Sequence, residues 1–341
     1  MIRRLAAAVF TLGVAAVLLV AAWPQLFALQ RTPLVAHAAS LRGLASCVMI
    51  GLLLLVVVTS TLNRGFRSMA ASLGVMLIAF VLVNAAVLST RGFGGDSLGT
   101  QRAPEGASEV TVLAWNTLGP ATSAEDVAAL ALEAEADIVV LPETILETAT
   151  QVAVLMREGG SPMWARTLSY DQVSPALSTS LLTSAELGEY DYDSLAETTA
   201  VLPTVVATSR DGSGPTIVAV HAVAPMLNQF ENWKRDLNLL AGFCSGENVI
   251  MAGDFNATID HMTGLGAEPG KTLGECTDAA MAAGSAAIGT WPTRLPALLG
   301  APIDHVMATS DWTVLGTEVI QSLDDNGSDH RPIVARLAKS G

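Results

Sequence analysis

Three long apolar runs dominate the first part of the chain, and each can cross a lipid bilayer as a helix. They cover residues 5–29, 43–62 and 69–89. A helix of about 20 apolar residues spans the ~30 Å of hydrocarbon in a bilayer. The pattern therefore predicts a membrane region, residues 1–91, with three transmembrane helices. A cleaved signal peptide is the alternative for the first run, because Arg3 and Arg4 precede it and residues 36–38 (Ala-His-Ala) resemble a cleavage site.

The hydrophobic pattern changes after this region. Residues 92–108 are rich in Gly, Ser and polar residues, which indicates a linker. From residue 109 onwards, short apolar runs typical of strands alternate with helical periodicity, which predicts one α/β domain over residues 109–341. Ser123 is a candidate helix N-cap, and Trp233 lies on the apolar face of a second predicted helix. The predicted strands are 110–116, 137–143, 204–208, 216–221, 248–252, 303–308 and 333–337, and the predicted helices are 123–136 and 226–244.

Charge divides the chain at the same place. Residues 1–93 contain seven arginines and no Lys, Asp or Glu, so the remainder carries 11 basic and all 32 acidic side chains. The two parts have formal charges of +7 and −21. Placing Arg3, Arg4, Arg64 and Arg67 in the cytoplasm predicts an extracytoplasmic C-terminal domain, although arginines in the first link between spans keep this bias small.

Polar side chains follow most of the predicted strands of this domain. An isolated polar residue at a strand end is usually a turn former, but a repeated set of amides, carboxylates and imidazoles at one edge of an α/β sheet indicates a ligand site. Carboxylates favour Mg²⁺ or Mn²⁺, and an Asp–His pair suits general-base work or phosphate contact. These residues are Asn116, Glu143, His221, Asp254, Asn256, Asp304, His305, Ser328, Asp329 and His330.

Several of these residues occur in motifs that, in this order, resemble the endonuclease/exonuclease/phosphatase superfamily. They are WN (115–116), LPE (141–143), a histidine at a strand end (221), GDFN (253–256), ID (303–304) and SDHRP (328–332). The matches extend over residues 109–338. The resemblance implies a four-layer α/β sandwich in which two mixed sheets pack face to face between helices. It also implies a metal-dependent phosphoric ester hydrolase.

The resemblance further implies a role for each matching residue. Glu143 would be the principal metal ligand, with Asn116 and Asp329 nearby, and the metal would be Mg²⁺ or Mn²⁺. The remaining residues would act on the water and the phosphate: Asp254 and Asn256 position or activate the water, His330 acts on phosphate or water and is oriented by Asp304, and His221 stabilises phosphate charge. Whether Asp254 or His330 is the base, and whether one metal or two operate, both stay open.

Some assignments rest on local context. The triplet Ile-Asp-His occurs at residues 259–261 and 303–305, and only the second begins a predicted strand, so Asp260 and His261 are predicted to be loop residues. Because side chains alternate along a strand, His305 is expected to point away from the site. Trp291 and Arg294 precede this strand and are candidate substrate contacts, or they pack and solvate a loop. Cys244 and Cys276 form either a disulfide or two buried thiols.

The composition also bears on the substrate. Nucleic-acid binding normally needs Lys and Arg clusters, which disfavours a nuclease in a domain of charge −21. Three spans confine the domain to a bilayer surface and favour a phosphorylated lipid. The architecture also resembles VanJ/StaP-type bacterial membrane proteins associated with teicoplanin resistance, which implies an extracytoplasmic phosphatase acting on undecaprenyl pyrophosphate or a related envelope lipid. The alternatives are an extracytoplasmic DNA or RNA nuclease and a catalytically inactive binding module.

Overall fold

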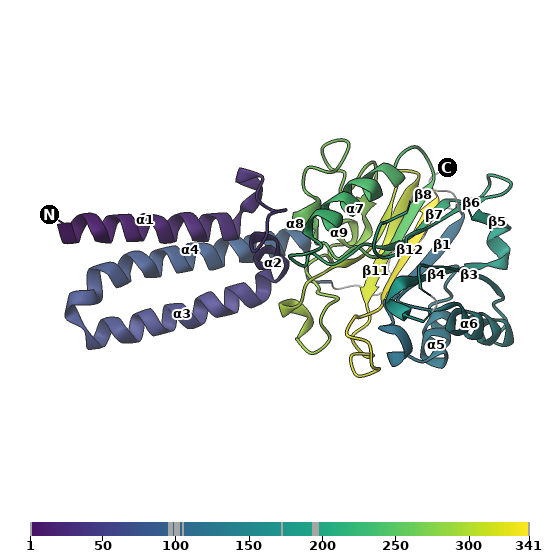
Figure 1. Ribbon diagram of the computed structural model, residues 1–341, viewed down its shortest axis with the longest axis horizontal. Coiled ribbons are helices and arrows are strands. Elements are labelled where there is room, and N and C mark those ends of the chain that lie inside the picture. Colours follow the sequence, from purple (N-terminus) through teal and green to yellow (C-terminus); the bar gives the residue numbers. More distant parts are fainter. Residues whose placement is uncertain are drawn as a thin grey trace.

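A computed structural model describes residues 2–94, 98, 103, 106–171, 173–192 and 198–339 of the chain. The molecule is elongated, with a bundle of apolar helices on one side and an α/β domain on the other (Figure 1). The N-terminus lies at the end of the bundle far from the domain (Figure 1). Most of the predicted linker, residues 92–108, falls outside the described residues.

Three helices in the described part of the chain are long and apolar enough to cross a membrane: α1 (Ile2–Ala22), α3 (Arg42–Leu62) and α4 (Arg67–Arg91). The helix α1 ends before residue 29, the end predicted from hydropathy. Trp23 leaves helical geometry, with φ −141° and ψ 66°, and Pro24 follows it; proline disfavours helical geometry in the residue before it. Short elements connect the long helices: η1 (Pro24–Phe27), α2 (Val35–Ser40) and η2 (Arg64–Phe66).

The domain contains two six-stranded mixed sheets. The strand order of the first is β11 (Trp312–Val319), β12 (Ile333–Lys339), β1 (Glu109–Ala114), β2 (Ile138–Pro142), β4 (Ser178–Ser184) and β3 (Met163–Ser169). That of the second is β5 (Tyr190–Tyr192), β6 (Val205–Ser209), β7 (Thr216–His221), β8 (Val249–Asp254), β10 (Asp304–Ala308) and β9 (Thr277–Asp278). The β1–β2 and β7–β8 pairs are parallel, and the other pairs are antiparallel.

Helices cover the outer faces of both sheets, so the predicted four-layer sandwich is confirmed. The helices α5 (Ala124–Glu133) and α6 (Leu146–Glu158) pack on the first sheet, and α7 (Phe230–Phe243) packs on the second. Between the sheets, apolar side chains such as Val112, Ile217 and Ile250 form a fully buried core. The Ser123 side chain caps α5, and Trp233 is fully buried, as their positions in the sequence predicted.

The remaining elements are short and occur in the loops: η3 (Gly119–Ala121), η4 (Pro175–Leu177), η5 (Ala185–Leu187), α8 (Ile259–Met262), α9 (Ala279–Ala283) and η6 (Ala297–Leu299). The prediction that Asp260 and His261 are loop residues is wrong, because both are buried in α8. Cys244 and Cys276 form a disulfide, with their Cα atoms 5.8 Å apart.

Candidate active site

Strand register places three of the predicted site residues in one row across the second sheet. His221 is paired with Asp254 in the parallel β7–β8 ladder, and Asp254 is paired with Asp304 in the antiparallel β8–β10 ladder. Residues that are paired between neighbouring strands lie side by side on the same face of the sheet. The imidazole and both carboxylates therefore meet at one edge of the sandwich, and all three are buried.

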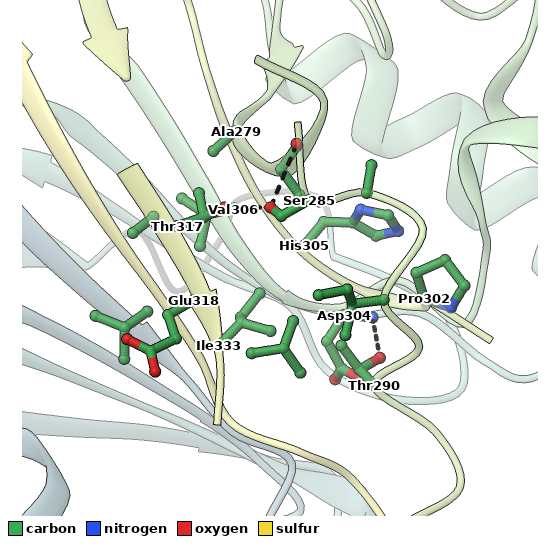
Figure 2. Close-up of a pocket in the computed structure, with 16 residues that line it drawn as sticks. Ala279, Ser285, Thr290, Pro302, Asp304, His305, Val306, Thr317, Glu318 and Ile333 are labelled. Carbon is green, nitrogen blue, oxygen red and sulfur yellow. Dashed lines mark hydrogen bonds between the residues drawn. The ribbon is translucent and has the colours of Figure 1, made fainter. Parts of the chain in front are cut away.

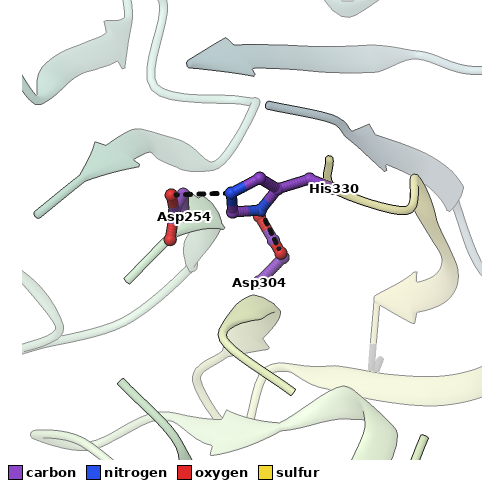
Figure 3. A group of neighbouring side chains, drawn as sticks. All are labelled: Asp254, Asp304 and His330. Atoms are coloured by element: carbon purple, nitrogen blue, oxygen red, sulfur yellow. Dashed lines mark hydrogen bonds and ion pairs between the residues drawn. The ribbon is translucent and has the colours of Figure 1, made fainter. Parts of the chain in front are cut away.

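His330, from the loop before β12, completes a compact cluster with two of these residues (Figure 3). Its Nδ1 lies 2.9 Å from Asp304 Oδ2, and its Nε2 lies 3.8 Å from Asp254 Oδ2. One ligand atom from each of the three side chains lies within 4.8 Å of the others. Because β12 belongs to the first sheet, His330 connects that sheet to the row of His221, Asp254 and Asp304 on the second sheet.

The charges in this cluster shift the pKa values of its members. Burial raises the pKa of Asp254 to about 7, and the nearby charge of Asp304 acts in the same direction. Burial by itself would lower the pKa of His330, but the charges of Asp304 and Asp254 outweigh it and raise that pKa to about 10. At neutral pH, His330 is therefore a cation held between two carboxyl groups, and Asp254 is ready to exchange a proton.

The first sheet supplies Asn116 and Glu143, which follow β1 and β2. The Asn116 side-chain amide donates to Glu143 Oε1 and to Asp254 Oδ2, with both distances 3.1 Å. Glu143 has a φ of +58°, a left-handed conformation that is uncommon for a residue with a side chain. Strain of this kind often occurs at functional sites. Asn116 thus connects the predicted metal ligand to the buried cluster.

Asn256 lies just beyond Asp254 and is held tightly. Its backbone N–H donates to Asp254 Oδ1 at 2.8 Å, and its side-chain amide donates to the Ala222 carbonyl at 2.9 Å. Its φ of +47° is a second left-handed conformation in the site. The GDFN turn therefore presents an acid and an amide to the same space, as expected for groups that orient a water molecule.

His221 is a neutral imidazole. Burial lowers its pKa to about 3, with a further contribution from the positive charge of His330. Its Nδ1 lies 3.4 Å from the hydroxyl of Thr179, a residue that the sequence did not indicate. A neutral histidine here can donate one hydrogen bond to a phosphoryl oxygen, from the ring nitrogen that carries the proton.

The candidate substrate contacts differ from each other. Trp291 Nε1 donates to Asp329 Oδ2 at 2.8 Å, and Asp329 Oδ1 lies 4.0 Å from His330 Nε2. The Asp329 side chain is 44% exposed, so it lies at the mouth of the site. Trp291 therefore orients a site carboxylate. Arg294 is exposed, and no partner of its side chain is found in the described part of the chain.

Three other residues hold the site loops together: Ser328, which the strand-end pattern indicated, and Trp115 and Arg331, which it did not. Ser328 donates to the Asn116 carbonyl at 2.6 Å and accepts from the His330 N–H at 3.0 Å. The buried Trp115 donates to the His330 carbonyl at 2.9 Å. The buried Arg331 donates to the carbonyls of residues 289, 293 and 295, which fixes the loop carrying Trp291. Only membership of the WN and SDHRP motifs could have indicated Trp115 and Arg331.

His305 points away from the cluster, as the alternation of side chains along β10 predicted. It lies 2.7 Å from Asp278 Oδ2 and 2.8 Å from the Ala257 carbonyl. A mostly apolar pocket lies between β10, the first sheet and α9. Asp304 and Thr290 lie at one end of this pocket (Figure 2). Thr290 Oγ1 accepts from the Asp304 N–H at 3.1 Å. Two buried Asp–His pairs thus use opposite faces of one strand.

The residues fit a divalent cation. The buried Asp304 Oδ1 has no hydrogen-bond partner within the described residues, and the surrounding donors are mainly carboxylate and amide oxygens. Oxygen donors of this kind suit hard cations such as Mg²⁺ and Mn²⁺. The compact cluster is not the trio that the resemblance assigns to metal, Glu143, Asn116 and Asp329. Asn116 links the two groups, since it contacts both Glu143 and Asp254.

Known proteins share this sequence pattern and fold. A model of the Endonuclease/Exonuclease/phosphatase family matches residues 113–330, which include every predicted site residue. The chain belongs to this family. No curated protein matches the sequence.

Several solved structures share the architecture of the domain. One is an endonuclease/exonuclease/phosphatase from Beutenbergia cavernae, with 17% identity and a TM-score of 0.50 over 68% of this chain and 72% of that chain. Another is humanized D. rerio TDP2, with 18% identity and a TM-score of 0.51 over 67% of this chain and 98% of that chain. D. rerio TDP2 complexed with a single strand DNA product has 17% identity and a TM-score of 0.50 over 67% and 99%. These similarities concern the fold.

Proposed function

We propose that this chain is a membrane-anchored phosphoesterase that uses Mg²⁺ or Mn²⁺ and hydrolyses the phosphate ester or pyrophosphate of an envelope lipid such as undecaprenyl pyrophosphate. The observation that carries the proposal is the cluster of Asp254, Asp304 and His330, with Asn116 and Asn256 directed to the same space. The cluster supplies both a proton acceptor and a cationic donor for phosphoryl transfer.

In the proposed reaction, water attacks phosphorus while the bond from phosphorus to the leaving oxygen breaks. Asp254 and Asn256 orient the water, and its proton passes to Asp254. Neutral His221 and cationic His330 donate to phosphoryl oxygens as their negative charge redistributes. A bound divalent cation, held by Glu143 with Asn116 and Asp329, would polarise these oxygens.

Two features support a lipid substrate over nucleic acid. The domain carries a formal charge of −21, which repels a polyanion. The loop that holds Trp291 continues into η6, where the backbone of Leu298 lies against Gly43 at the start of α3. Leu298 is 50% exposed. An exposed leucine beside the end of an apolar helix suits the interfacial region of a bilayer, so the site loop is close to where lipid headgroups would lie.

The experiment compares the purified full-length protein with Glu143→Gln in Mg²⁺, offering undecaprenyl pyrophosphate and plasmid DNA separately. Phosphate release from the lipid, lost in the variant, is the expected result. DNA cleavage without phosphate release would make the protein a nuclease and refute the argument from charge. Lipid hydrolysis at an unchanged rate in the variant would refute the role of Glu143.

We also propose that the catalytic domain is extracytoplasmic. The disulfide between Cys244 and Cys276 is typical of an oxidising compartment, and the turn between α3 and α4 lies at the far end from the domain (Figure 1). An impermeant maleimide should label Glu268→Cys in intact cells and should label Arg64→Cys only after permeabilisation, since both positions are exposed. The reverse pattern would show the opposite orientation.

A further inference from the structure

One buried carboxylate of the catalytic domain collects hydrogen bonds from the apolar helical region. Asp260 in α8 is 2% exposed. Arg42 at the start of α3 donates two hydrogen bonds to it, from Nε to Oδ2 and from Nη2 to Oδ1, both at 2.7 Å. Arg91 at the end of α4 adds Nη2 at 2.8 Å, and Gln25 adds Nε2 at 2.6 Å. Burial would raise the pKa of Asp260, but the two guanidinium groups lower it, so the group is a carboxylate at neutral pH.

The same arginine ties the apolar helices to one another. Arg42 Nη1 donates to the Ala22 carbonyl at the end of α1, at 2.9 Å, and to Asn84 Oδ1 in α4, at 2.7 Å. All three long helices therefore meet around Arg42. Because Arg42 also binds Asp260, a change in the packing of these helices would displace Asp260. Removing one partner of such a buried pair leaves an uncompensated charge, which costs about 3–5 kcal/mol. The three long helices and α8 therefore share one hydrogen-bonded junction at Arg42.

The neighbouring histidine makes a second connection. His261 Nδ1 accepts from the Thr258 N–H at 2.9 Å, so its Nε2 carries the proton and donates to the Ala36 carbonyl in α2 at 3.0 Å. Burial lowers the pKa of His261 to about 4, which keeps the ring neutral, as this pair of hydrogen bonds requires. Arg31 Nη1 donates to the His261 carbonyl at 2.6 Å. The helix α8 is therefore held from the apolar helical region at two points.

From α8 the contacts continue into the catalytic site. The ring of His261 lies edge-on to the ring of Trp233, with centroids 5.1 Å apart. Trp233 Nε1 donates to the Asn256 carbonyl at 3.0 Å, and Asn256 in turn donates to both oxygens of Asp254. Asn256 is in a left-handed conformation that the surrounding contacts must maintain. A shift of α8 would reach the water-orienting groups through one packed tryptophan.

We propose that Asp260 and His261 are positioning residues through which the apolar helices hold Asn256 and Asp254 in catalytic geometry. Neither residue touches the reacting atoms. The docked helical bundle thus sets the turnover rate in addition to anchoring the domain. The inference rests on the proposed hydrolysis for its kinetic readout only, because the position of Trp233 can be measured without any substrate.

Two variants of the full-length protein in lipid nanodiscs test this. Asp260→Asn removes the charge at the centre of the junction. Gly43→Ala removes no polar group but places a Cβ on the Leu298 carbonyl, which forces α3 away from the domain. Gly51→Ala is the matched control, because the same change in the same helix meets no atom within 4 Å. Each protein is labelled with 5-fluorotryptophan, and the Trp233 resonance is assigned by Trp233→Phe.

Asp260→Asn is expected to shift the ¹⁹F resonance of Trp233 and to lower kcat about 10-fold or more, with KM changed less than 3-fold. Gly43→Ala is expected to do the same to a smaller extent, and Gly51→Ala to do neither. A merely structural role would lower the melting temperature without moving the resonance or kcat of the folded fraction. If Asp260→Asn fails to fold, the Trp233 resonance and kcat of Gly43→Ala decide whether the inference holds.

An unshifted Trp233 resonance in a folded variant would overturn the inference. A shifted resonance with unchanged kcat would overturn it as well, because the displacement would then have no catalytic effect. If the protein cuts DNA and spares the lipid, kcat is measured on DNA, and the same comparison decides the inference although the proposed substrate has failed. If the wild type hydrolyses neither substrate, the proposed function fails, and the resonance alone decides the coupling.

Discussion

Replacing Asp304 by Asn keeps the size of the side chain but removes the negative charge that faces His330. In the native site, Asp304 Oδ2 lies 2.9 Å from His330 Nδ1, and both groups are buried. The carboxylate accepts from the Nδ1–H of the ring, which fixes the orientation of the ring, and it stabilises the protonated form. An amide can present either its oxygen or its NH₂ group to the ring, so the variant loses both the charge and the enforced orientation.

The size of the effect follows from the pKa of His330. The pKa rises from 6.5 to about 10, and the charge of Asp304 is the largest contribution that raises it. At 1.36 kcal/mol per pKa unit, the shift corresponds to roughly 5 kcal/mol in favour of the protonated ring. The charge-assisted hydrogen bond from Asp304 supplies part of this, about 1.5–3 kcal/mol, which equals about a 10- to 100-fold loss in kcat.

A second buried Asp–His pair, between Asp278 in β9 and His305 in β10, provides the control. Asp278 Oδ2 lies 2.7 Å from His305 Nδ1, on the face of β10 that points away from the site. Asp278→Asn keeps an oxygen that can accept from the Met281 N–H and cap α9. Both variants lose a hydrogen bond of a buried charged pair, so each should lose about 1.5–3 kcal/mol of stability. Only Asp304→Asn should lose turnover.

The assay measures phosphate release and the melting temperature for both variants of the full-length protein at saturating Mg²⁺. Normalising kcat to the folded fraction separates catalysis from stability. Equal losses of kcat in the two variants would show that Asp304 acts through the fold. A kcat for Asp304→Asn within 3-fold of the wild type would refute the role assigned to the Asp304–His330 pair.

Three further predictions concern stability. Replacing Cys244 and Cys276 by Ser should lower the free energy of unfolding by about 4 kcal/mol, because the disulfide closes a loop with a sequence separation of 32, and dithiothreitol should lower the wild-type melting temperature alike. The pKa of His261 falls from 6.5 unfolded to about 4 folded, so unfolding binds a proton between these values. The contribution of His261 to the free energy of unfolding is fully present above pH 6.5 and falls by about 1.4 kcal/mol per pH unit towards pH 4. His261→Gln should remove this part of the slope when the free energy of unfolding is plotted against pH. Gly253→Ala should destabilise the domain by about 3 kcal/mol or more, because φ is +133° and the new Cβ would overlap a carbonyl of β7, whereas Gly242→Ala meets no atom within 4 Å and should be tolerated in thermal unfolding.

Local patterns in the sequence were enough to predict much of the fold. Apolar length alone indicates the three long helices, and alternation or continuous apolar runs indicate strands such as β7 and β8. The strand β4 was not predicted, because Ser178, Thr179, Ser180 and Thr183 look polar although all are buried in the sheet. The hydroxyls of Ser178 and Ser180 find partners only when the neighbouring strand β3 is in place, because Ser169 and Thr167 supply them.

The site shows the same division. Motif residues at strand ends could be named from the sequence because each follows a recognisable strand. Their assembly depends on register, which aligns His221, Asp254 and Asp304 across three strands that are far apart in the chain. No local pattern specifies register, since it is set by which faces of the strands are buried together.

The repeated triplet Ile-Asp-His shows most clearly what the sequence by itself could not determine. At residues 303–305 the preceding and following pattern places the aspartate in the site. At residues 259–261 the same letters suggested a loop, yet Asp260 is buried against Arg42, 218 positions away in the chain. When a carboxylate and a guanidinium are this far apart in the sequence, no local pattern indicates that they pair. Only the folded chain, in which neither charge can be buried without the other, decides that they meet.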